Sequence, residues 1–240
     1  MGRLALITGG SAGIGAAIVR ELGKAGHRLA FSYCTGKDRA QSLVQELAAQ
    51  GVEVRAFHAD FAQPTAARSL YQQVADWGGT PQVLVNNAGP GRATPLSDTL
   101  GADTMAIMQV NVAAPLDLIA AAAPGMKAGG VILNISSLNG RMPPAQVTGF
   151  AASKAALDAA TRALALELGP RDIRVLGLAP GPIERDEAPR PQDVRDKIRS
   201  KTALPRFGTV QDVAKMAAFL VSDDSQFATG EVIGLHGGWH

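Results

Sequence analysis

The chain of 240 residues contains little cysteine, little aromatic material and little net charge. Its one cysteine, Cys34, excludes a disulfide or a cysteine-based zinc site within one chain. The four histidines show no metal-ligand spacing, so no metal site is expected. The net charge of +2 comes without a long block of one sign, which gives little support to binding of nucleic acid or membranes.

Long hydrophobic runs are also missing. No continuous apolar run approaches the length of a membrane span. The first apolar run, residues 4–8, is too short for the hydrophobic region of a signal peptide and passes directly into a glycine-rich segment. We therefore expect a cytoplasmic protein.

Short apolar runs alternate with segments of helical period along the whole chain, and this alternation indicates a parallel sheet covered on both faces. The expected strands are residues 4–8, 29–33, 52–58, 82–86, 131–136, 173–179 and 231–235. The expected helices are residues 12–25, 38–50, 64–77, 100–123, 150–168 and 210–220. We predict a single α/β domain over residues 1–240, a doubly wound Rossmann-type sheet of about seven strands with helices on both faces.

Residues 180–205 break this pattern because five prolines lie there among many charged residues. Such a segment cannot form a core strand or an unbroken helix. We interpret residues 182–205 as a lid over the substrate site, with a short helix near residues 193–200. The alternative is a variable surface loop.

A glycine-rich segment, Thr8 to Gly15, joins the first expected strand to the first expected helix. Glycines in this position allow a tight turn and let the backbone approach a pyrophosphate, while the helix N-terminus offers free N–H groups. A dinucleotide site is favoured over a plain turn because the segment follows a strand and opens a helix.

The spacing Gly-x-x-x-Gly-x-Gly resembles the cofactor loop of the short-chain dehydrogenase/reductase family. Further segments match the family in the same order, namely Asn86 to Gly89, Asn111, Ser136-Ser137 and Pro180-Gly181. Including residues 204–208 and 228–233, the pattern is most similar to 3-oxoacyl-[acyl-carrier-protein] reductases. The resemblance implies hydride transfer between a nicotinamide cofactor and the carbon of a carbonyl group or alcohol.

The glycine loop and the resemblance together give a set of expected cofactor contacts. They are Gly9, Ser11, Gly13, Ile14, Gly15, Ser32, Tyr33, Lys37, Asp60, Phe61, Asn87, Ala88, Gly89, Lys154, Pro180, Gly181 and Ile183. For Asp60, a helix N-cap near Pro64 is the alternative.

The end of the second expected strand favours NADP(H) over NAD(H) as the cofactor. An acidic residue there would bind the ribose 2′-hydroxyl of NAD and repel a 2′-phosphate. This chain instead has Ser32-Tyr33-Cys34, followed by the cations Lys37 and Arg39. The alternative is that both cations belong to the solvated start of a helix.

The resemblance also implies a catalytic set: a serine, a tyrosine, a lysine four residues after it, and a helix asparagine. Ser137, Lys154 and Asn111 stand at the matching positions, but the tyrosine position holds Phe150. The only tyrosines, Tyr33 and Tyr71, fall in other elements. Loss of general acid–base help slows a reaction by about 10²–10⁴-fold, so carbonyl reduction should be impaired to that extent.

Three explanations of Phe150 stay open. The chain is a Tyr-to-Phe variant of an ordinary reductase, or a natural member that takes its proton from water, Thr148 or the substrate, or a protein that binds the cofactor without turnover. Arg185 stands where the family commonly has a threonine. It contacts a cofactor phosphate or an anionic substrate, or it points to solvent.

The expected partners are a small-molecule carbonyl substrate, free or linked to a carrier protein or coenzyme A, and further copies of the chain. The helix at 100–123 is apolar nearly all round, and a second apolar stripe suggests burial against another subunit. The alanine-rich helix at 151–165 would allow close helix packing, although alanine is also simply a good helix former. Both fit the family's homotetramer or a homodimer.

Overall fold

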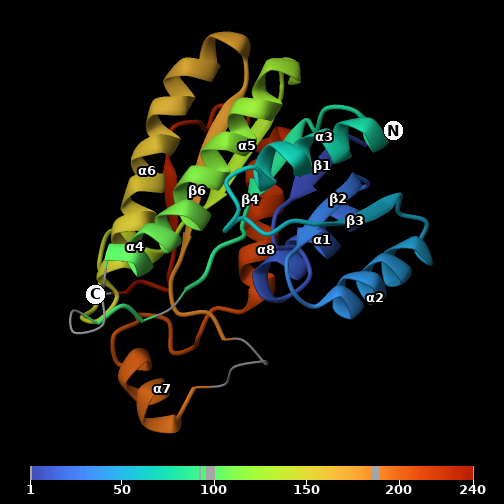
Figure 1. Cartoon of the computed structure of the whole chain (residues 1–240). Helices are drawn as coiled ribbons and strands as arrows, with labels where there is room; N and C mark the ends of the chain where they lie inside the picture. The colour runs from blue at the N-terminus through green and yellow to red at the C-terminus, as the bar shows by residue number, and fades with distance from the viewer. Residues whose placement is uncertain (1, 92, 96–100, 185–189, 240) are drawn as a thin grey trace.

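The structure, a computed structural model, describes residues 2–91, 93–95, 101–184 and 190–239 (Figure 1). Its centre is a parallel sheet of seven strands in the order β3-β2-β1-β4-β5-β6-β7. The strands are β1 (Leu4–Ile7), β2 (Arg28–Tyr33), β3 (Val54–His58), β4 (Val83–Asn86), β5 (Val131–Ile135), β6 (Arg174–Pro180) and β7 (Val232–Leu235). The predicted doubly wound sheet of about seven strands is confirmed.

The strand order reverses between β1 and β4, which pair through Ala5–Val83 and Leu6–Leu84. The chain goes from β1 outward to β2 and β3, and then returns to β4 on the other side of β1. The loops after β1 and β4 therefore leave the sheet in different directions. Such a reversal opens a crevice at the carboxyl ends of the strands.

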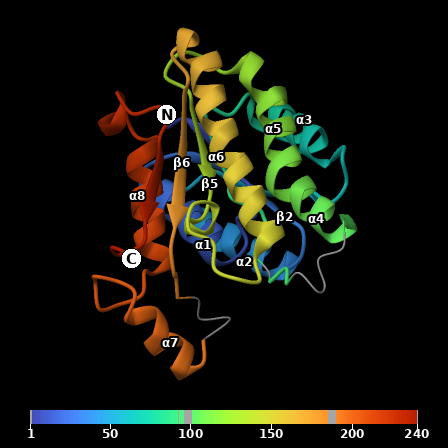
Figure 2. The ribbon, with the colours of Figure 1, turned by 90° about the vertical axis from the view of Figure 1, so that its left-hand side faces the viewer.

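Helices cover both faces of the sheet because successive strand residues point to opposite sides. One core contains Ala5 and Ile7 of β1 with α1 (Gly13–Lys24), α2 (Lys37–Ala48) and α8 (Val210–Val221). The other contains Leu4 and Leu6 with α3 (Ala66–Gly78), α5 (Ala114–Ala122) and α6 (Thr148–Leu168). Figure 2 shows α8 on one side of β5 and β6, and α5 and α6 on the other.

The helix expected at 100–123 contains an irregular turn. It consists of α4 (Gly101–Met108), a π-helical turn (Gln109–Ala113) and α5. A π turn adds one residue to a helical turn and often marks a functional site. Here it carries Asn111, whose side chain is fully buried.

The same segment, Asp103–Gly125, is the one helix among the described residues that is long and apolar enough to cross a membrane by length and composition. No continuous apolar run reveals it because Gln109, Asn111 and Asp117 interrupt the sequence. In the structure it packs against α3 and α6, and 39% of its most apolar window is buried. The other residues of that window are half-buried or exposed, and Met105 is largely exposed.

The segment after β6 contains the expected short helix, α7 (Gln192–Arg199). Both views place α7 outside the two helical layers, beyond the end of β6 (Figures 1 and 2). Arg190, Arg195 and Arg199 each lie over the Phe207 ring, at 5.3 to 5.8 Å from its centroid. Arg185 lies outside the described residues, so its predicted contact is untested.

The remaining helical turns are short 3₁₀ segments at Ala123–Gly125, Leu138–Gly140, Gly169–Arg171 and Asp223–Ser225. The turn at Leu138–Gly140 follows β5 directly and positions Ser137, which caps it.

Candidate cofactor and active site

The loop between β1 and α1 is fixed by the ends of the neighbouring strands. The Thr8 hydroxyl accepts hydrogen bonds from the backbone N–H groups of Asn87 and Ala88, both at 2.9 Å. The Gly9 N–H donates to the Ser32 hydroxyl at 3.1 Å. These contacts tie the loop to β4 on one side and to β2 on the other.

Glycines let this loop fold tightly over the start of α1. Gly9 and Gly13 have φ angles of +65° and +51°, which side chains rarely tolerate. A Cβ atom on Gly15 would lie 2.1 Å from the Gly9 carbonyl oxygen. The N-cap residue Ala12 offers no side-chain cap, so the first N–H groups of α1 stay available to a ligand. This arrangement fits a pyrophosphate.

A cleft of about 820 Å³ runs from this loop along the carboxyl ends of the strands. Every cofactor residue expected from the sequence lines it, except Lys37. The cleft also reaches Ser137, Phe150 and Lys154, so the expected catalytic positions adjoin the expected cofactor site.

The catalytic end of the cleft is built by β5 and α6. The Ser137 hydroxyl accepts the Asn139 N–H at 3.2 Å and keeps its own proton for donation. Phe150 and Lys154 lie one turn apart on α6, and the Lys154 Nζ is 5.9 Å from the centroid of the Phe150 ring. The same Nζ donates to the Ile135 carbonyl at 2.9 Å.

Asn111 lies next to this end but does not line the cleft. Its Nδ2 donates to the Ser153 hydroxyl at 2.9 Å, and that hydroxyl donates its only proton to the Phe150 carbonyl at 2.7 Å. Ser153 can therefore only accept from Asn111, which fixes the orientation of the amide. The Oδ1 of Asn111 lies against Gly89 and is buried without a hydrogen-bond partner.

Burial shifts the pKa values of Lys154 and of its neighbour Asp158. Desolvation lowers the pKa of Lys154 to about 8, although the nearby Asp158 carboxylate opposes this shift. Burial also raises the pKa of Asp158, which accepts a hydrogen bond from Ser136 and has Arg141 Nε at 3.7 Å. The lysine thus titrates far closer to neutrality than an exposed lysine.

A family model described as enoyl-(acyl carrier protein) reductase matches residues 9–240. The chain belongs to the short-chain dehydrogenase/reductase family. This confirms the resemblance that the glycine loop and the ordered motifs indicate.

Several proteins are similar to this short-chain dehydrogenase/reductase along their whole length. The cyclic-di-GMP-binding biofilm dispersal mediator protein of Escherichia coli K12 is 37% identical, over 98% of this chain and 96% of the relative. A 3-oxoacyl-[acyl-carrier-protein] reductase of Staphylococcus epidermidis is 32% identical over 100% of both chains. The crystal structure of a blue fluorescent protein from a metagenomic library in complex with NADPH is 42% identical, covers 99% of this chain and 97% of that one, and has a TM-score of 0.94. Because these similar proteins have such different names, the reaction of this chain has to be argued from its own site.

The cation beside the cleft differs from the one that the sequence favours. Lys37 is the first residue of α2 and does not line the cleft, whereas Arg39 does. Two residues along a helix turn by about 200°, so these side chains leave α2 on different sides. A Cβ atom on Gly36 would lie 2.3 Å from the Arg39 guanidinium, which places this group directly against Gly36.

Asp60 lines the cleft, and its alternative assignment as a helix N-cap is wrong. Its carboxylate accepts the Ala62 N–H at 3.0 Å, which closes a local turn. The N-cap of α3 is Thr65 instead.

The cleft includes residues that the motifs do not select as cofactor contacts: Ala12, Cys34, Thr35, Arg39, Ala59, Pro90, Gly91, Val110, Ile135, Ser136 and Arg190. Most are sequence neighbours of selected residues and could have been found by extending each motif. Arg190 could not, because it lies in the irregular segment between β6 and α7 and no family motif marks it.

Proposed function

We propose that this short-chain dehydrogenase/reductase is an NADPH-dependent carbonyl reductase that works without the usual tyrosine. The observation that carries the proposal is the single cleft that joins the uncapped start of α1 to Ser137 and Lys154. Chemistry at a carbonyl group needs hydrogen-bond donors at the oxygen, and this end of the cleft provides them.

The residues present fit a phosphorylated dinucleotide. The glycine loop and the start of α1 would hold the pyrophosphate, and Arg39 would hold a 2′-phosphate. No carboxylate follows β2 before Lys37 to repel that phosphate. The similar structure with bound NADPH supports this choice over NAD(H). A bound reduced nicotinamide supplies a hydride to the carbonyl carbon.

Ser137 would donate its hydroxyl proton in a hydrogen bond to the carbonyl oxygen and so orient the substrate. Phe150 lies beside the same space but has no donor. The proton that completes the alcohol must come from elsewhere, and a rate about 10²–10⁴-fold below that of a tyrosine-containing relative is expected.

Residues 182–205 contain six lysines or arginines and five aspartates or glutamates, a net charge of +1, so the charge of the lid does not select an anionic carrier. A 3-oxoacyl-type substrate is proposed because the sequence pattern, including residues 204–208 and 228–233, most resembles 3-oxoacyl-[acyl-carrier-protein] reductases. The name of the 3-oxoacyl relative points the same way, while the family model's description names reduction of a carbon–carbon double bond.

A second candidate is cofactor binding without turnover. Phe150 favours it because the cleft retains its cofactor-binding features while lacking a catalytic hydroxyl. The Escherichia coli relative, which is named for binding a cyclic dinucleotide, supports a binding role as well.

The deciding experiment is Phe150→Tyr, assayed as NADPH consumption with a panel of ketones and 3-oxoacyl thioesters. The reductase proposal expects an increase of about 10²–10⁴-fold. Phe227→Tyr is the matched control, since Phe227 is fully exposed and should change nothing. If both variants bind NADPH and neither consumes it with any substrate, the binding-only candidate replaces the reductase.

We also propose a cytoplasmic homodimer or homotetramer built through α4, α5 and α6. Apolar side chains on these helices support this assembly, with Met105 exposed to 67% and Leu166 to 81% in the single chain. An outward apolar surface of this kind favours burial against a second copy.

A further inference from the structure

The cleft contains few groups that can give up a proton. Among the described residues that line it, the ionisable side chains are Tyr33, Cys34, Arg39, Asp60, Lys154 and Arg190. The first four lie at the end of β2 or just after it, in the first turn of α2, and two residues after β3, on the far side of β1 from α6. The other two are Lys154 on α6 and Arg190, between β6 and α7.

Arginine keeps its proton at any working pH, so Arg190 cannot act as an acid. Thr148, another proton source that the sequence suggests, starts α6 and is not among the residues that line the cleft. Lys154 is therefore the titratable donor of the cleft that lies on the same helix as Phe150, with its nitrogen 5.9 Å from the centroid of that ring.

The position of Lys154 allows it to reach the same space. It follows Phe150 by one helical turn, so both side chains project on one face of α6. An ammonium group has three N–H donors, and Lys154 uses one of them in its hydrogen bond to the Ile135 carbonyl. Two N–H donors remain on the Lys154 nitrogen, which lies 5.9 Å from the centre of the Phe150 ring.

A route for returning the proton lies beside Gly89. A Cβ atom on Gly89 would be 2.5 Å from Asn111 Oδ1 and 3.6 Å from Lys154 Nζ, so both atoms border the same point. Asn111 Oδ1 is buried and has no donor, which is costly unless a water or a cation serves it. Gly89 itself is exposed, so this point is close to solvent.

The charged groups around Lys154 are few. Asp158 lies one turn further along α6, and Arg141 and Arg162 surround that carboxylate. Arg190 lines the same cleft and donates a hydrogen bond to the Ile183 carbonyl at 2.8 Å. A buried lysine whose pKa is lowered to about 8 is a far better acid near neutral pH than an exposed lysine.

We propose that Lys154 is the general acid of this enzyme and gives an ammonium proton, directly or through one water, to the oxygen of the substrate carbonyl. The hydride that reaches the carbonyl carbon moves an electron pair of the C=O bond onto this oxygen, and the proton neutralises it. The carbonyl gains two electrons, the nicotinamide loses two, and Lys154 becomes a neutral amine. The amine regains its proton from solvent through the space beside Gly89 and Asn111. This inference rests on the proposed reductase function.

The test is the pH dependence of kcat/KM with NADPH and a neutral ketone that has no ionisable group. The acid form is the active one, so the rate should be constant below a pH of about 8 and fall by about tenfold per pH unit above it. Isotope-labelled lysine NMR of the protein without substrate gives the pKa of Lys154 directly, and the two values should agree.

Lys154→Arg separates proton donation from charge. It keeps a cation in the cleft but cannot release a proton, so we expect NADPH binding, followed by fluorescence, to persist while turnover falls by about 10²-fold or more and the decline at high pH disappears. Lys127→Arg is the matched control, because Lys127 is exposed near the start of β5.

Two results would overturn the inference. One is a Lys154→Arg variant that keeps the rate and pH profile of the original chain. The other is a kinetic profile that ignores the ionisation seen by NMR; either result would make Lys154 a positioning residue. Phe150→Tyr distinguishes this failure from failure of the proposed function. If the original chain and Phe150→Tyr both reduce ketones while Lys154→Arg keeps the rate and pH profile of the original chain, the reductase proposal stands and only the lysine acid is wrong. If neither the original chain nor Phe150→Tyr reduces ketones, the reductase proposal itself fails.

Discussion

Phe150 lacks only the hydroxyl oxygen of a tyrosine, and the other expected catalytic residues lie near its ring. Ser137 and Lys154 line the same cleft, and Asn111 lies behind it in the π turn. Sequence spacing alone locates these positions because they follow β5 directly or lie on one helix, where residue intervals translate into geometry. Their charge states depend on burial, and burial cannot be predicted from the spacing of residues in the sequence.

Arg39 and Lys37 offer a residue-scale test of the cofactor. Arg39→Gln should weaken NADPH binding by about 10- to 100-fold, since a charge-assisted hydrogen bond to phosphate contributes about 1.5–3 kcal/mol. NADH binding should change little, because this cofactor lacks the 2′-phosphate. Titration of each reduced cofactor, followed by its fluorescence, measures both effects.

Lys37→Gln is the control for Arg39→Gln. It also removes one positive charge from the start of α2, but Lys37 does not line the cleft. Its effect on NADPH binding should be small. An equal loss in both variants would mean that only the general positive charge of this region matters.

At the scale of elements, α8 is fixed by side chains at both ends. At its start, Thr209 and Asp212 form a capping box, and Arg206 donates to the Asp212 carboxylate at 2.7 Å. At its end, Arg174 of β6 donates to the carbonyl oxygens of Leu220 and Ser222, at 3.0 and 2.9 Å. The helix whose ends are fixed in this way packs against α1, which carries the cofactor loop at its start.

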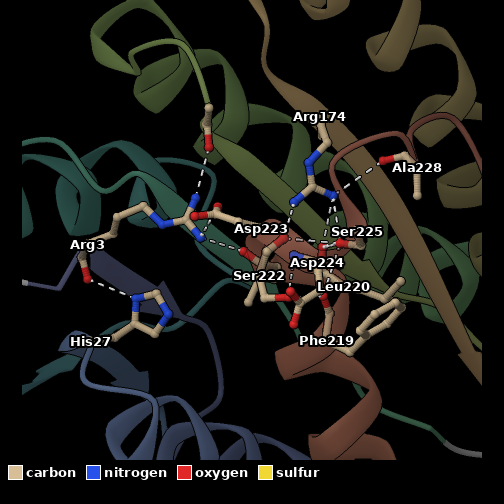
Figure 3. A network of polar contacts seen from close by, with 12 residues as sticks. Arg3, His27, Arg174, Phe219, Leu220, Ser222, Asp223, Asp224, Ser225 and Ala228 are labelled. Atoms are coloured by element: carbon tan, nitrogen blue, oxygen red, sulfur yellow. Dashed lines mark hydrogen bonds and ion pairs between the residues drawn. The ribbon is translucent and has the colours of Figure 1, made fainter.

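Arg174 gives the first prediction at this scale. Its side chain is buried and joins the end of α8 to Ser225 and Ala228, as Figure 3 shows. Arg174→Met should lower the free energy of unfolding by about 1–3 kcal/mol, because buried carbonyl groups lose a charged donor. Urea unfolding measures it. Arg68→Met, at an exposed position on α3, should change stability little, and equal effects would contradict the capping role.

Asp212 gives a prediction about pH. Hydrogen bonds from Arg206 and Thr209 lower the pKa of Asp212 to about 2. A lowered pKa stabilises the fold above the ordinary aspartate pKa of 3.8, and this stabilisation is lost as the pH falls toward 2. The difference in unfolding free energy between the original chain and Asp212→Asn should therefore be full at neutral pH and shrink between about pH 4 and 2.

Asp193→Asn serves as the control for Asp212→Asn. Asp193 also lies in the first turn of a helix, α7, but that helix has no side-chain cap. Denaturant unfolding at a series of pH values measures all three proteins. A difference for Asp212→Asn that stays constant down to pH 2 would contradict the ion-paired capping box.

At the scale of the whole molecule, the outward faces of α4, α5 and α6 remain apolar although the sheet is already covered. The exposed face of α6 carries small residues and Leu166, and the side chains of Met105 and Leu166 are largely exposed. Two layers of helices satisfy the core of one chain, so these faces need another reason to be apolar.

We predict that the protein has the mass of two or four chains in solution, measured by light scattering during size-exclusion chromatography. Ala159→Arg places a long cation on the exposed face of α6 and should lower that mass. Ala48→Arg, at an exposed alanine near the end of α2, is the control and should not. A monomeric original chain would refute the assembly.

The sequence by itself determined the alternation of strands and helices, the glycine loop, and the order Asn111, Ser137, Phe150 and Lys154. These features depend on local periodicity and fixed spacing along the chain, and both are visible in the sequence without a structure. Tertiary structure decided which cation lines the cleft, because the start of α2 directs Arg39 and not Lys37 toward it. It also decided the protonation of Lys154 and the approach of Arg190, since both depend on burial by segments that are distant in the sequence.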